Sequence, residues 1–288
     1  MRVIIQTTLN ASFDLALEES LHLSVEEGAA GNTWRIWQPA APALIIGTGQ
    51  EAALEVNLEF ARSNNIPVLR RHSGGGAVVI GPGAINYSAF YRFSDLPGSE
   101  TIRGAMSAAL KPVVAALKTF GIDAEEAGLS DLAVTSPPSP LSCEERGSRS
   151  GAGEERGQSD DAVLPSPRRR GVGGEVKRKI AGNSQARKRH AVVVHGTLLA
   201  DPNFALMENL LRFPSSVPDY RSGREHRTFL TSLREQHAPF DLDSFTNALL
   251  SELPSDKVVT SAASADEYAR AERLAVEKYG SDAWNFRR

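Results

Sequence analysis

The chain has 288 residues, of which 41% are hydrophobic and 23% are charged, and this balance is typical of a globular protein with a sizeable core. A formal net charge of −3 supplies no basic field of the kind that attracts nucleic acid, so we expect no nucleic-acid partner. Cys143 is the single cysteine, which excludes an internal disulfide framework and a multi-cysteine zinc site and is typical of a reducing compartment. No stretch approaches the roughly 20 apolar residues of a membrane span, and we therefore predict a cytoplasmic protein without a membrane partner.

The N-terminal part of the chain predicts one long helix and several short strands. Residues 3–6 form an expected strand, and Ser12 is the expected N-cap of a helix that stops near Gly28. The runs at 33–38 and 43–47 combine aromatic and β-branched residues. The Pro/Ala turn between these two runs predicts a hairpin or an adjacent strand pair.

The rest of the chain alternates helices and strands irregularly, which predicts an α+β or mixed α/β class. The segment 99–120 has helical spacing, and Pro112 inside it is expected to kink or split that helix. The run KIAGNSQARKRHAVVVHGTLLA predicts two strands joined by a tight basic turn at 187–190. Further helices are expected at 58–62, 203–211, 243–253 and 264–279, and further strands at PVLRR, GGGAVVIG and NYSAFY.

Residues 135–176 differ in composition from the remainder. Aromatic residues are absent there, and Pro, Gly, Ser, Arg and Glu dominate. Such a segment cannot bury enough apolar surface to form a core. We predict a disordered insert between two strands of a single domain that spans residues 1–288, because lengthening a surface loop adds to its entropic cost only slowly.

The strongest local signal is the run RRHSGGGAVVIGPGAINYSAF, residues 70–90. Three successive glycines after paired arginines allow backbone amides to approach an anionic ligand without side-chain hindrance, and Arg70 and Arg71 add positive charge. The spacing matches neither a P-loop nor a dinucleotide-binding fingerprint. A plain glycine turn between strands is an equally good explanation of the glycines alone.

A second cluster places Lys179 three residues before Gly182, with Asn, Ser and Gln following. A lysine here could hold a carboxylate and the phosphate of an activated ester, because it is a compact cation of adjustable pKa. The alternative is a solvated basic turn, which suits residues 187–190 and, taken alone, Lys179 as well. His195 is interpreted as a hydrogen-bonded packing residue in preference to a catalytic base, and no His/Cys spacing predicts a protein-held zinc.

Together and in order, these motifs resemble the lipoate-protein ligase A family and its relatives among biotin ligases and octanoyltransferases. The matching stretches cover nearly the whole chain outside the insert: NASFDLALEESL, RIWQP, LIIGTGQ, EVN, RRHSGGGAVVIGPGAINYS, GLSDLAV, KIAGNSQARKR, HGTLL, PDYRSGREHRTFL and KYGSDAWNF. The resemblance implies an α+β domain with a mixed, largely antiparallel sheet and flanking helices, similar to class II synthetase and biotinyl-ligase domains.

The resemblance also implies roles for individual residues. In the family the arginine and glycine loop lines an acyl-adenylate pocket, and the K-x-x-G lysine contacts the acyl carbonyl and the phosphate. The matching positions are Arg70, Gly74, Gly75, Gly76, Asn86, Gly182 and Lys179, the last as the catalytic residue. Asp131, in GLSDL, matches an acidic position near the nucleotide phosphates and their magnesium ion.

The activity implied by the resemblance is that of a lipoate-protein ligase. Lipoate would attack the α-phosphate of ATP, with Mg²⁺ neutralising the phosphates, and a lysine of a carrier domain would capture the lipoyl-adenylate. The expected carriers are lipoyl domains of 2-oxoacid dehydrogenases or the H-type protein of glycine cleavage. Two departures stand out: residues 79–82 replace the histidine and aspartate of many relatives, and the chain ends where longer ligases continue into a C-terminal accessory domain. A separate accessory protein is therefore a further candidate partner.

Two alternatives remain open. Octanoyl or lipoyl transfer from an acyl carrier needs a cysteine thiolate near the lysine, and Cys143, inside the insert, is the one cysteine of the chain. The stretch GLSDLAV, which corresponds to the transferase nucleophile segment, contains no cysteine, and this favours the ligase. The second alternative is a binding or regulatory module that retains the pocket without turnover.

Overall fold

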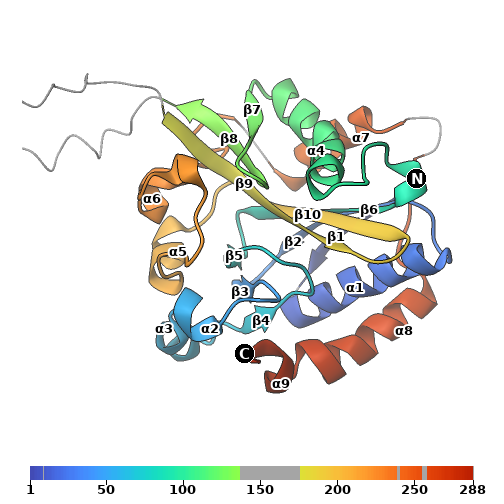
Figure 1. Cartoon of the computed structure of the whole chain (residues 1–288), viewed down its shortest axis with the longest axis horizontal. Helices are drawn as coiled ribbons and strands as arrows, with labels where there is room; N and C mark the ends of the chain where they lie inside the picture. The colour runs from blue at the N-terminus through green and yellow to red at the C-terminus, as the bar shows by residue number, and fades with distance from the viewer. Residues whose placement is uncertain (9, 137–175, 239–240, 255–257, 288) are drawn as a thin grey trace, which may run out of the picture.

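The computed structural model describes residues 1–8, 10–136, 176–238, 241–254 and 258–287 (Figure 1). In these residues the main sheet has the strand order β11-β1-β2-β6-β10-β9-β8-β7, and a small sheet has the order β4-β3-β5. The strands are β1 (Arg2–Thr8), β2 (Thr33–Pro39), β3 (Ala43–Ile46), β4 (Val68–Arg70), β5 (Val78–Ile80), β6 (Ala84–Arg92), β7 (Ala124–Ala127), β8 (Asp131–Ser136), β9 (Val176–Arg187), β10 (Ala191–Leu199) and β11 (Val259–Thr260). In the main sheet β1 pairs in parallel with β2 and β11, and the other pairings are antiparallel, which confirms the predicted mixed, largely antiparallel sheet.

Helices cover both faces of the main sheet. They are α1 (Ala11–Glu27), α2 (Ala52–Glu55), α3 (Leu58–Ser63), α4 (Ile102–Thr119), α5 (Phe204–Leu210), α6 (His226–Phe229), α7 (Leu242–Glu252), α8 (Ala265–Leu274), which continues as a π-helical turn (Ala275–Tyr279), and α9 (Asp282–Asn285). Figure 1 shows α4 and α7 on one side of the sheet and α1 and α8 on the other. Within the described residues, no helix combines the length and the apolar character that crossing a membrane requires.

Three apolar clusters follow from this layering. The largest lies between the main sheet and α4 with α7, and the second lies between the opposite face, α1, α8 and the small sheet. The third joins the outer face of the small sheet to α2, α3 and α5. The small sheet is therefore packed on both faces, and the space between it and the main sheet is the interior in which a site can form.

The start of α1 differs from the expected N-cap. Asn10 caps the helix, because its side-chain oxygen accepts hydrogen bonds from the backbone N–H groups of Ser12 and Phe13. Asparagine and serine are about equally good caps, so the sequence NAS offered two candidates and the helix begins at the earlier one. Gly28 ends the helix as predicted, with a left-handed φ of 77°.

The expected pairing of 33–38 with 43–47 is wrong. β2 lies in the main sheet between β1 and β6, whereas β3 is the central strand of the small sheet. Both strands are almost wholly buried, and a strand that is buried on both faces carries no alternation from which its partner can be read. The turn between them is a crossing from one sheet to the other.

Pro112 does not split its helix. α4 runs without a break from Ile102 to Thr119, and Pro112 lies inside it. A proline costs a helix interior about 3 kcal/mol or more. One face of α4 buries seven side chains in the largest cluster, among them Met106, Leu110 and Leu117. At about 1.5–3 kcal/mol for each large apolar side chain, that burial outweighs the loss.

The predicted insert leaves the fold at the end of a hairpin. Thr135 and Ser136 belong to β8 and Val176 to β9, so the edges of the expected segment are strand residues. Ser136 and Val176 are cross-strand partners. Residues 137–175, with Cys143, lie outside the described residues, and the prediction of disorder stays a prediction.

The pairing of Ser136 with Val176 yields a stability prediction. Replacing residues 137–175 by a short Asn-Gly turn should shift the thermal midpoint by less than about 3 °C, because the two strand ends already lie opposite each other and the core is untouched. Differential scanning calorimetry of the two proteins measures this. A drop several times larger would mean that the removed segment packs on the domain.

Candidate active site

A cavity of about 1100 Å³ lies between the main sheet and the small sheet. Its walls are formed by α1, by β6, β9 and β10 of the main sheet, by the small sheet and by the segment 211–221. Small-molecule sites usually measure roughly 300–1,000 Å³, so this cavity is large enough for a ligand with more than one part. Apolar side chains form part of the wall: Leu15, Trp37, Ile45, Val78 and Ile80.

Most of the predicted site residues meet on this cavity. Those that line it are Gly74, Gly75, Gly76, Asn86, Asp131, Lys179 and Gly182. They come from a loop and three strands that are far apart in the sequence. Pairing of β9 with β8 and β10 brings the strand residues together, and the Ser184 hydroxyl on β9 bonds the loop at the Gly74 carbonyl.

The centre of the polar wall is an ion pair between Lys179 and Asp131. The Lys179 Nζ lies 2.7 Å from the Asp131 Oδ1, and the side chains are 25% and 9% exposed. The Tyr220 hydroxyl donates to the Asp131 Oδ2 at 2.8 Å. Burial and the neighbouring Asp131 carboxylate raise the pKa of Tyr220, so the phenol stays protonated and keeps donating.

A β-bulge directs Lys179 into the cavity. Leu132 pairs with Ala181 and Ala133 pairs with Lys179, so β9 contains one extra residue, Ile180, at this step. Ile180 and Ala181 both bury their side chains in the cluster under α4, and Lys179 emerges on the opposite face. A bulge re-aims side chains in this way.

Gly182 makes room for the Lys179 side chain. A Cβ atom at Gly182 would lie 2.7 Å from the Lys179 Nζ and 2.8 Å from its Cε. The lysine therefore crosses directly over the glycine on its way to Asp131. This close approach is a physical reason for the K-x-x-G spacing.

Asn183 fixes the turn that carries Asp131. Its backbone N–H and its Nδ2 both donate to the carbonyl of Ser130, at 2.8 and 2.7 Å. Its Oδ1 accepts from the Tyr87 hydroxyl. Two donors of Asn183 thus hold the residue before β8, and Tyr87 holds the Asn183 side chain in place. Asp131, the first residue of β8, therefore has little freedom to move away from Lys179.

Asn86 lies on the same face of the main sheet, two strands away from Gly182 and on the side opposite to Asp131. Asn86, Thr197 and Gly182 are successive cross-strand partners on β6, β10 and β9, so Asn86 stands about 10 Å from Gly182 at strand spacing. The Thr197 hydroxyl donates to the Asn86 Oδ1 at 2.7 Å, and among the described residues the buried Asn86 Nδ2 has no hydrogen-bond partner. An unpaired buried donor on a cavity wall suits an acceptor oxygen of a ligand.

Arg71 holds the glycine loop against the sheet. Its Nε donates to the carbonyl of Gly74 at 3.0 Å and its Nη2 to the carbonyl of Gly76 at 2.8 Å. The Ser184 hydroxyl on β9 donates to the same Gly74 carbonyl at 2.8 Å. Gly75 between them has a φ of 82°, which few other residues adopt. Burial lowers the pKa of Arg71 to about 10, which leaves it charged at neutral pH.

Arg70, the other arginine of the motif, is placed differently. Arg70 as a whole is 1% exposed. Its guanidinium donates to six backbone carbonyls, which belong to Gly47, Thr48, Gln50, Trp284, Asn285 and Arg287. The structure therefore brings Arg71, and not Arg70, to the cavity. Two adjacent arginines at a strand end point to opposite sides, and nothing in the order of the residues shows which side faces the cavity.

A chain of hydrogen bonds ties α1 to the glycine loop. The His195 Nδ1 lies 2.8 Å from the Glu18 Oε1, the Glu18 Oε2 accepts from the Ser88 hydroxyl at 2.6 Å, and the His195 Nε2 bonds the Ser73 hydroxyl at 2.7 Å. Burial acts to raise the pKa of Glu18, but His195 and the hydrogen bonds hold it below its usual range. Because Ser73 is 1% exposed, its hydroxyl anchors the loop in place and is not presented as a nucleophile.

The predicted magnesium role of Asp131 meets one constraint. Both carboxylate oxygens are engaged, and the described residues contain no group of three or more His, Cys, Asp or Glu side chains placed to hold a metal ion. Magnesium is commonly bound by one or two carboxylates together with substrate phosphates. Asp131 suits that arrangement only if a nucleotide brings the other oxygens.

Comparison with known proteins agrees with this geometry. Residues 10–254 match the model of the lipoyl protein ligase A/B catalytic domain. An octanoyltransferase LipM of Brevibacillus brevis is 26% identical, over 100% of this chain and 99% of its own, and lipoate–protein ligase 1 of Staphylococcus aureus is 24% identical, over 94% of this chain and 71% of its own. A solved chain from the lipoylation system of Thermoplasma acidophilum, a bi-partite lipoate protein ligase and its E2 lipoyl domain, has a TM-score of 0.72 at 20% identity and covers 100% of this chain and 97% of that one.

The chain belongs to the lipoyl protein ligase A/B catalytic domain family, and it has the fold of lipoate ligases. Members of this family are enzymes, and the relatives above include one ligase and one transferase. The predicted family and fold are confirmed.

Several site residues were missed in the sequence. Tyr220 and Thr197 lie inside stretches that resemble the family, but nothing in their spacing connects them with Asp131 or Asn86. Glu18 sits on a helix face that reads as ordinary amphipathic pattern, and His195 was expected to pack. Both line the cavity. The signal that could have identified Glu18 is its position on the buried face of α1, where a carboxylate is unusual. Which face of the helix is buried becomes known only with the fold.

The crowded space above Gly182 yields a prediction. Gly182→Ala should lower transfer activity at least tenfold, because the methyl group displaces the Lys179 Nζ from Asp131, yet the thermal midpoint should change little, since the obstacle is the far end of a flexible side chain. Gly31→Ala is the control, as a Cβ there meets nothing within 4 Å. Equal activities of the two variants would contradict the role of this contact.

The hydrogen bond between Thr197 and Asn86 yields another prediction. Thr197→Val keeps the volume but frees the Asn86 amide to rotate, and we expect about a tenfold loss of transfer activity, whereas Thr197→Ser should stay close to wild type. Thr246→Val is the matched control, because Thr246 is also buried and its hydroxyl has no partner in the described part of the chain. Steady-state rates of the four proteins decide the matter, and a valine variant as active as the serine variant would remove Thr197 from the site.

Proposed function

We propose that this protein is a lipoate–protein ligase that activates lipoate with ATP and transfers the lipoyl group to a lysine of a carrier domain. The observation that carries the proposal is the Lys179–Asp131 ion pair on the wall of a cavity that also has an apolar part. An ammonium group with three donors can bond Asp131 and still offer donors to a ligand. It is therefore prepared to receive an acyl carbonyl and a phosphate.

The first step of the proposed reaction forms a mixed anhydride. A lipoate carboxylate oxygen attacks the α-phosphorus of ATP, and pyrophosphate leaves with the Mg²⁺ that accompanies the nucleotide as substrate. Lys179 stabilises charge on the α-phosphate and the acyl oxygen, and Asn86 supplies a second donor from the opposite side. The glycine loop 74–76 approaches the same ligand with backbone amides.

The second step transfers the acyl group. The neutral amine of the carrier lysine attacks the acyl carbonyl, the bond to the phosphate oxygen breaks, AMP leaves, and one amine proton is released to solvent. Lys179 again stabilises the oxygen that gains charge. We infer that the carriers are lipoyl domains of 2-oxoacid dehydrogenases or an H-type protein of glycine cleavage, and that the reaction takes place in the cytoplasm.

The rival activity is octanoyl transfer, and the LipM relative, similar over its whole length, is the observation in its favour. That reaction would need a cysteine that accepts the acyl group as a thioester. The chain has one cysteine, Cys143, which lies outside the described residues, and the described side chains that line the cavity include no thiol. The chemistry on the cavity wall therefore supports activation by phosphate.

A separate accessory protein is a further part of the proposal. The solved Thermoplasma chain that this protein covers almost completely comes from a bi-partite ligase. We infer that this protein, like a bi-partite ligase, can depend on a second polypeptide for the adenylation step. Addition of such a polypeptide is the first test if the isolated chain is inactive.

The assay that separates the two activities uses wild type and Cys143→Ser with two donors. We expect lipoate plus ATP and Mg²⁺ to support carrier acylation by both proteins, and octanoyl-carrier without ATP to support it by neither, as measured by the mass of the carrier. Lys179→Met should abolish the ATP-dependent reaction. ATP-independent transfer that disappears with Cys143→Ser would establish the transferase instead. Ligand binding without turnover, even with the accessory protein, would establish a binding module.

A further inference from the structure

Arg70 is a buried cation that the proposed reaction does not use. All three of its guanidinium nitrogens donate to backbone carbonyls, at distances from 2.6 to 3.1 Å. Burial lowers the pKa of Arg70, and Arg287 nearby acts in the same direction. A buried charge that is compensated only by carbonyl dipoles is expensive, so its retention calls for a specific role.

The carbonyls belong to two segments that are far apart in the sequence. One is 47–50, where the Arg70 Nη1 bonds three carbonyls, and the other is 284–287, where the Nε and Nη2 bond three more. The second segment begins in the last turn of α9, at the C-terminal end of the described chain, and Figure 1 shows α9 close to β4. We call Arg70 together with residues 284–287 the C-terminal clasp.

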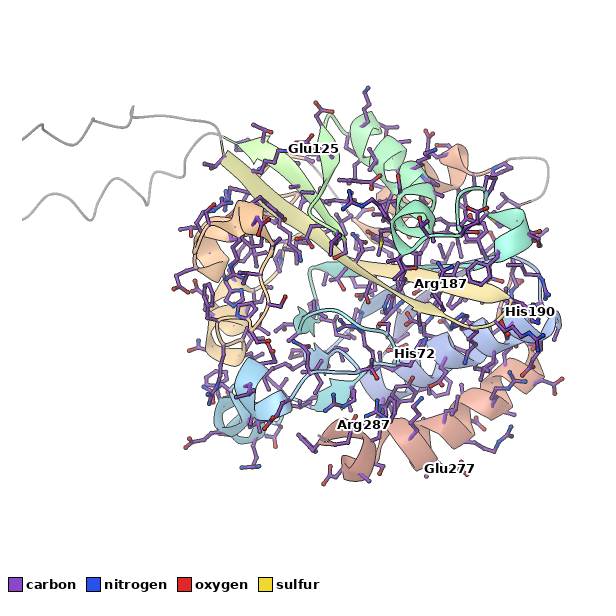
Figure 2. All side chains as sticks on the ribbon, in the orientation of Figure 1. His72, Glu125, Arg187, His190, Glu277 and Arg287 are labelled. Carbon is purple, nitrogen blue, oxygen red and sulfur yellow. The ribbon has the colours of Figure 1, made fainter. Side chains whose placement is uncertain are left out.

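Further bonds fasten the C-terminal segment to the Arg70 backbone. The Trp284 Nε1 donates to the Arg70 carbonyl at 2.8 Å, and the Arg70 N–H donates to the Asn285 Oδ1 at 2.9 Å. The Trp284 ring contacts two cations, with the Lys278 Nζ 4.0 Å and the Arg287 guanidinium 3.8 Å from its centre. Arg287, labelled in Figure 2, also donates to the Thr48 hydroxyl at 2.7 Å. Every polar group of Arg70 is thus bonded within the clasp or to the segment 47–50.

The segment 47–50 is itself part of the cavity. Thr48, Gly49 and Gln50 line it, as do the glycines 74–76. The two loops touch: the Thr48 N–H donates to the Ser73 carbonyl at 2.8 Å, and a Cβ at Gly47 would lie 2.1 Å from the Gly75 carbonyl oxygen. Any movement of 47–50 must therefore displace 73–76. We call these two segments the cavity loops.

We propose that the C-terminal clasp is a positioning device for the cavity loops, which fixes the shape that receives the acyl donor without touching that donor. Arg70 is then a positioning residue, and Trp284 is its principal partner. The inference rests on the proposed function in one respect only, since it takes the cavity to be the site of the acyl donor. It assigns a task to the KYGSDAWNF stretch, which contributes no residue to the cavity wall described above.

The first test measures hydrogen exchange of the cavity loops in the protein without any ligand. Trp284→Phe removes one hydrogen bond and keeps an aromatic ring, and it should speed exchange in 47–50 and 73–76 about fivefold. Arg70→Lys removes most of the guanidinium hydrogen bonds and should speed exchange in the same two segments more than about tenfold. The matched control is Arg92→Lys, because Arg92 also donates to backbone carbonyls, those of Val25 and Glu26, away from the cavity. It should leave the cavity loops unchanged.

Two results would overturn the proposal. One is unchanged exchange in the cavity loops of Trp284→Phe. The other is faster exchange that spreads equally over α1 and α8, which would mark the clasp as a general support of the fold. Neither result depends on which acyl donor the protein uses, so failure here is distinct from failure of the proposed function.

A kinetic readout completes the test once a donor is known. Trp284→Phe should raise the KM for the acyl donor about fivefold and keep kcat within about twofold, because loosened loops cost binding and leave Lys179 in place. Arg92→Lys should change neither constant. A fall in kcat with an unchanged KM would contradict a positioning role for the clasp.

Discussion

The ion pair between Lys179 and Asp131 is the interaction around which the rest of the site is arranged. It requires a bulge in β9 so that the lysine leaves the apolar face, and it requires a residue without a side chain at Gly182 so that the lysine can cross the strand. It also requires that the start of β8 stay still, which Asn183 ensures through the Ser130 carbonyl. The first two requirements cost the β-sheet stability, since a bulge interrupts the ladder and a glycine weakens a strand. Together they keep one ammonium group at a defined place above the sheet, where an anionic ligand can use it.

The polar groups of this wall are held in place by neighbours, and Lys179 and Asn86 still have hydrogen-bond donors available for a ligand. Lys179 keeps donors beyond the one it gives Asp131, Tyr220 saturates the far oxygen of Asp131, and Thr197 engages only the oxygen of the Asn86 amide. Preorganised donors of this kind favour charge that develops on a bound ligand, because they need no rearrangement when the charge appears. The same logic extends to the glycine loop, whose carbonyls are bonded by Arg71 and Ser184.

The family and the fold class could be predicted from the sequence, because many short motifs occur together and in order along the chain. The roles of single residues came from the resemblance to the family, and of those residues all but Arg70 line the cavity. What could not be predicted depends on contacts between distant segments. The pairing of β2 and β3 failed because both strands are buried on both faces, and the helix start at Asn10 was missed because serine two residues later is an equally good cap. Arg70 was expected at the ligand, and the neighbouring Arg71 looks the same in the sequence. Only the bonds from Arg70 to the carbonyls of residues 284–287 show that Arg70 points away from the cavity.

The contacts of Arg70 also determine when during synthesis the cavity can exist. The cavity loops lie in the first third of the chain, but the carbonyls that complete the guanidinium shell of Arg70 are made more than 200 residues later. A growing polypeptide on the ribosome folds from its N-terminus, and contacts of high sequence separation form late. The nascent chain can therefore build much of the sheet while Arg70 still lacks half of its partners. The clasp can close only after residues 284–287 have been made, so the cavity loops reach their final arrangement late in synthesis.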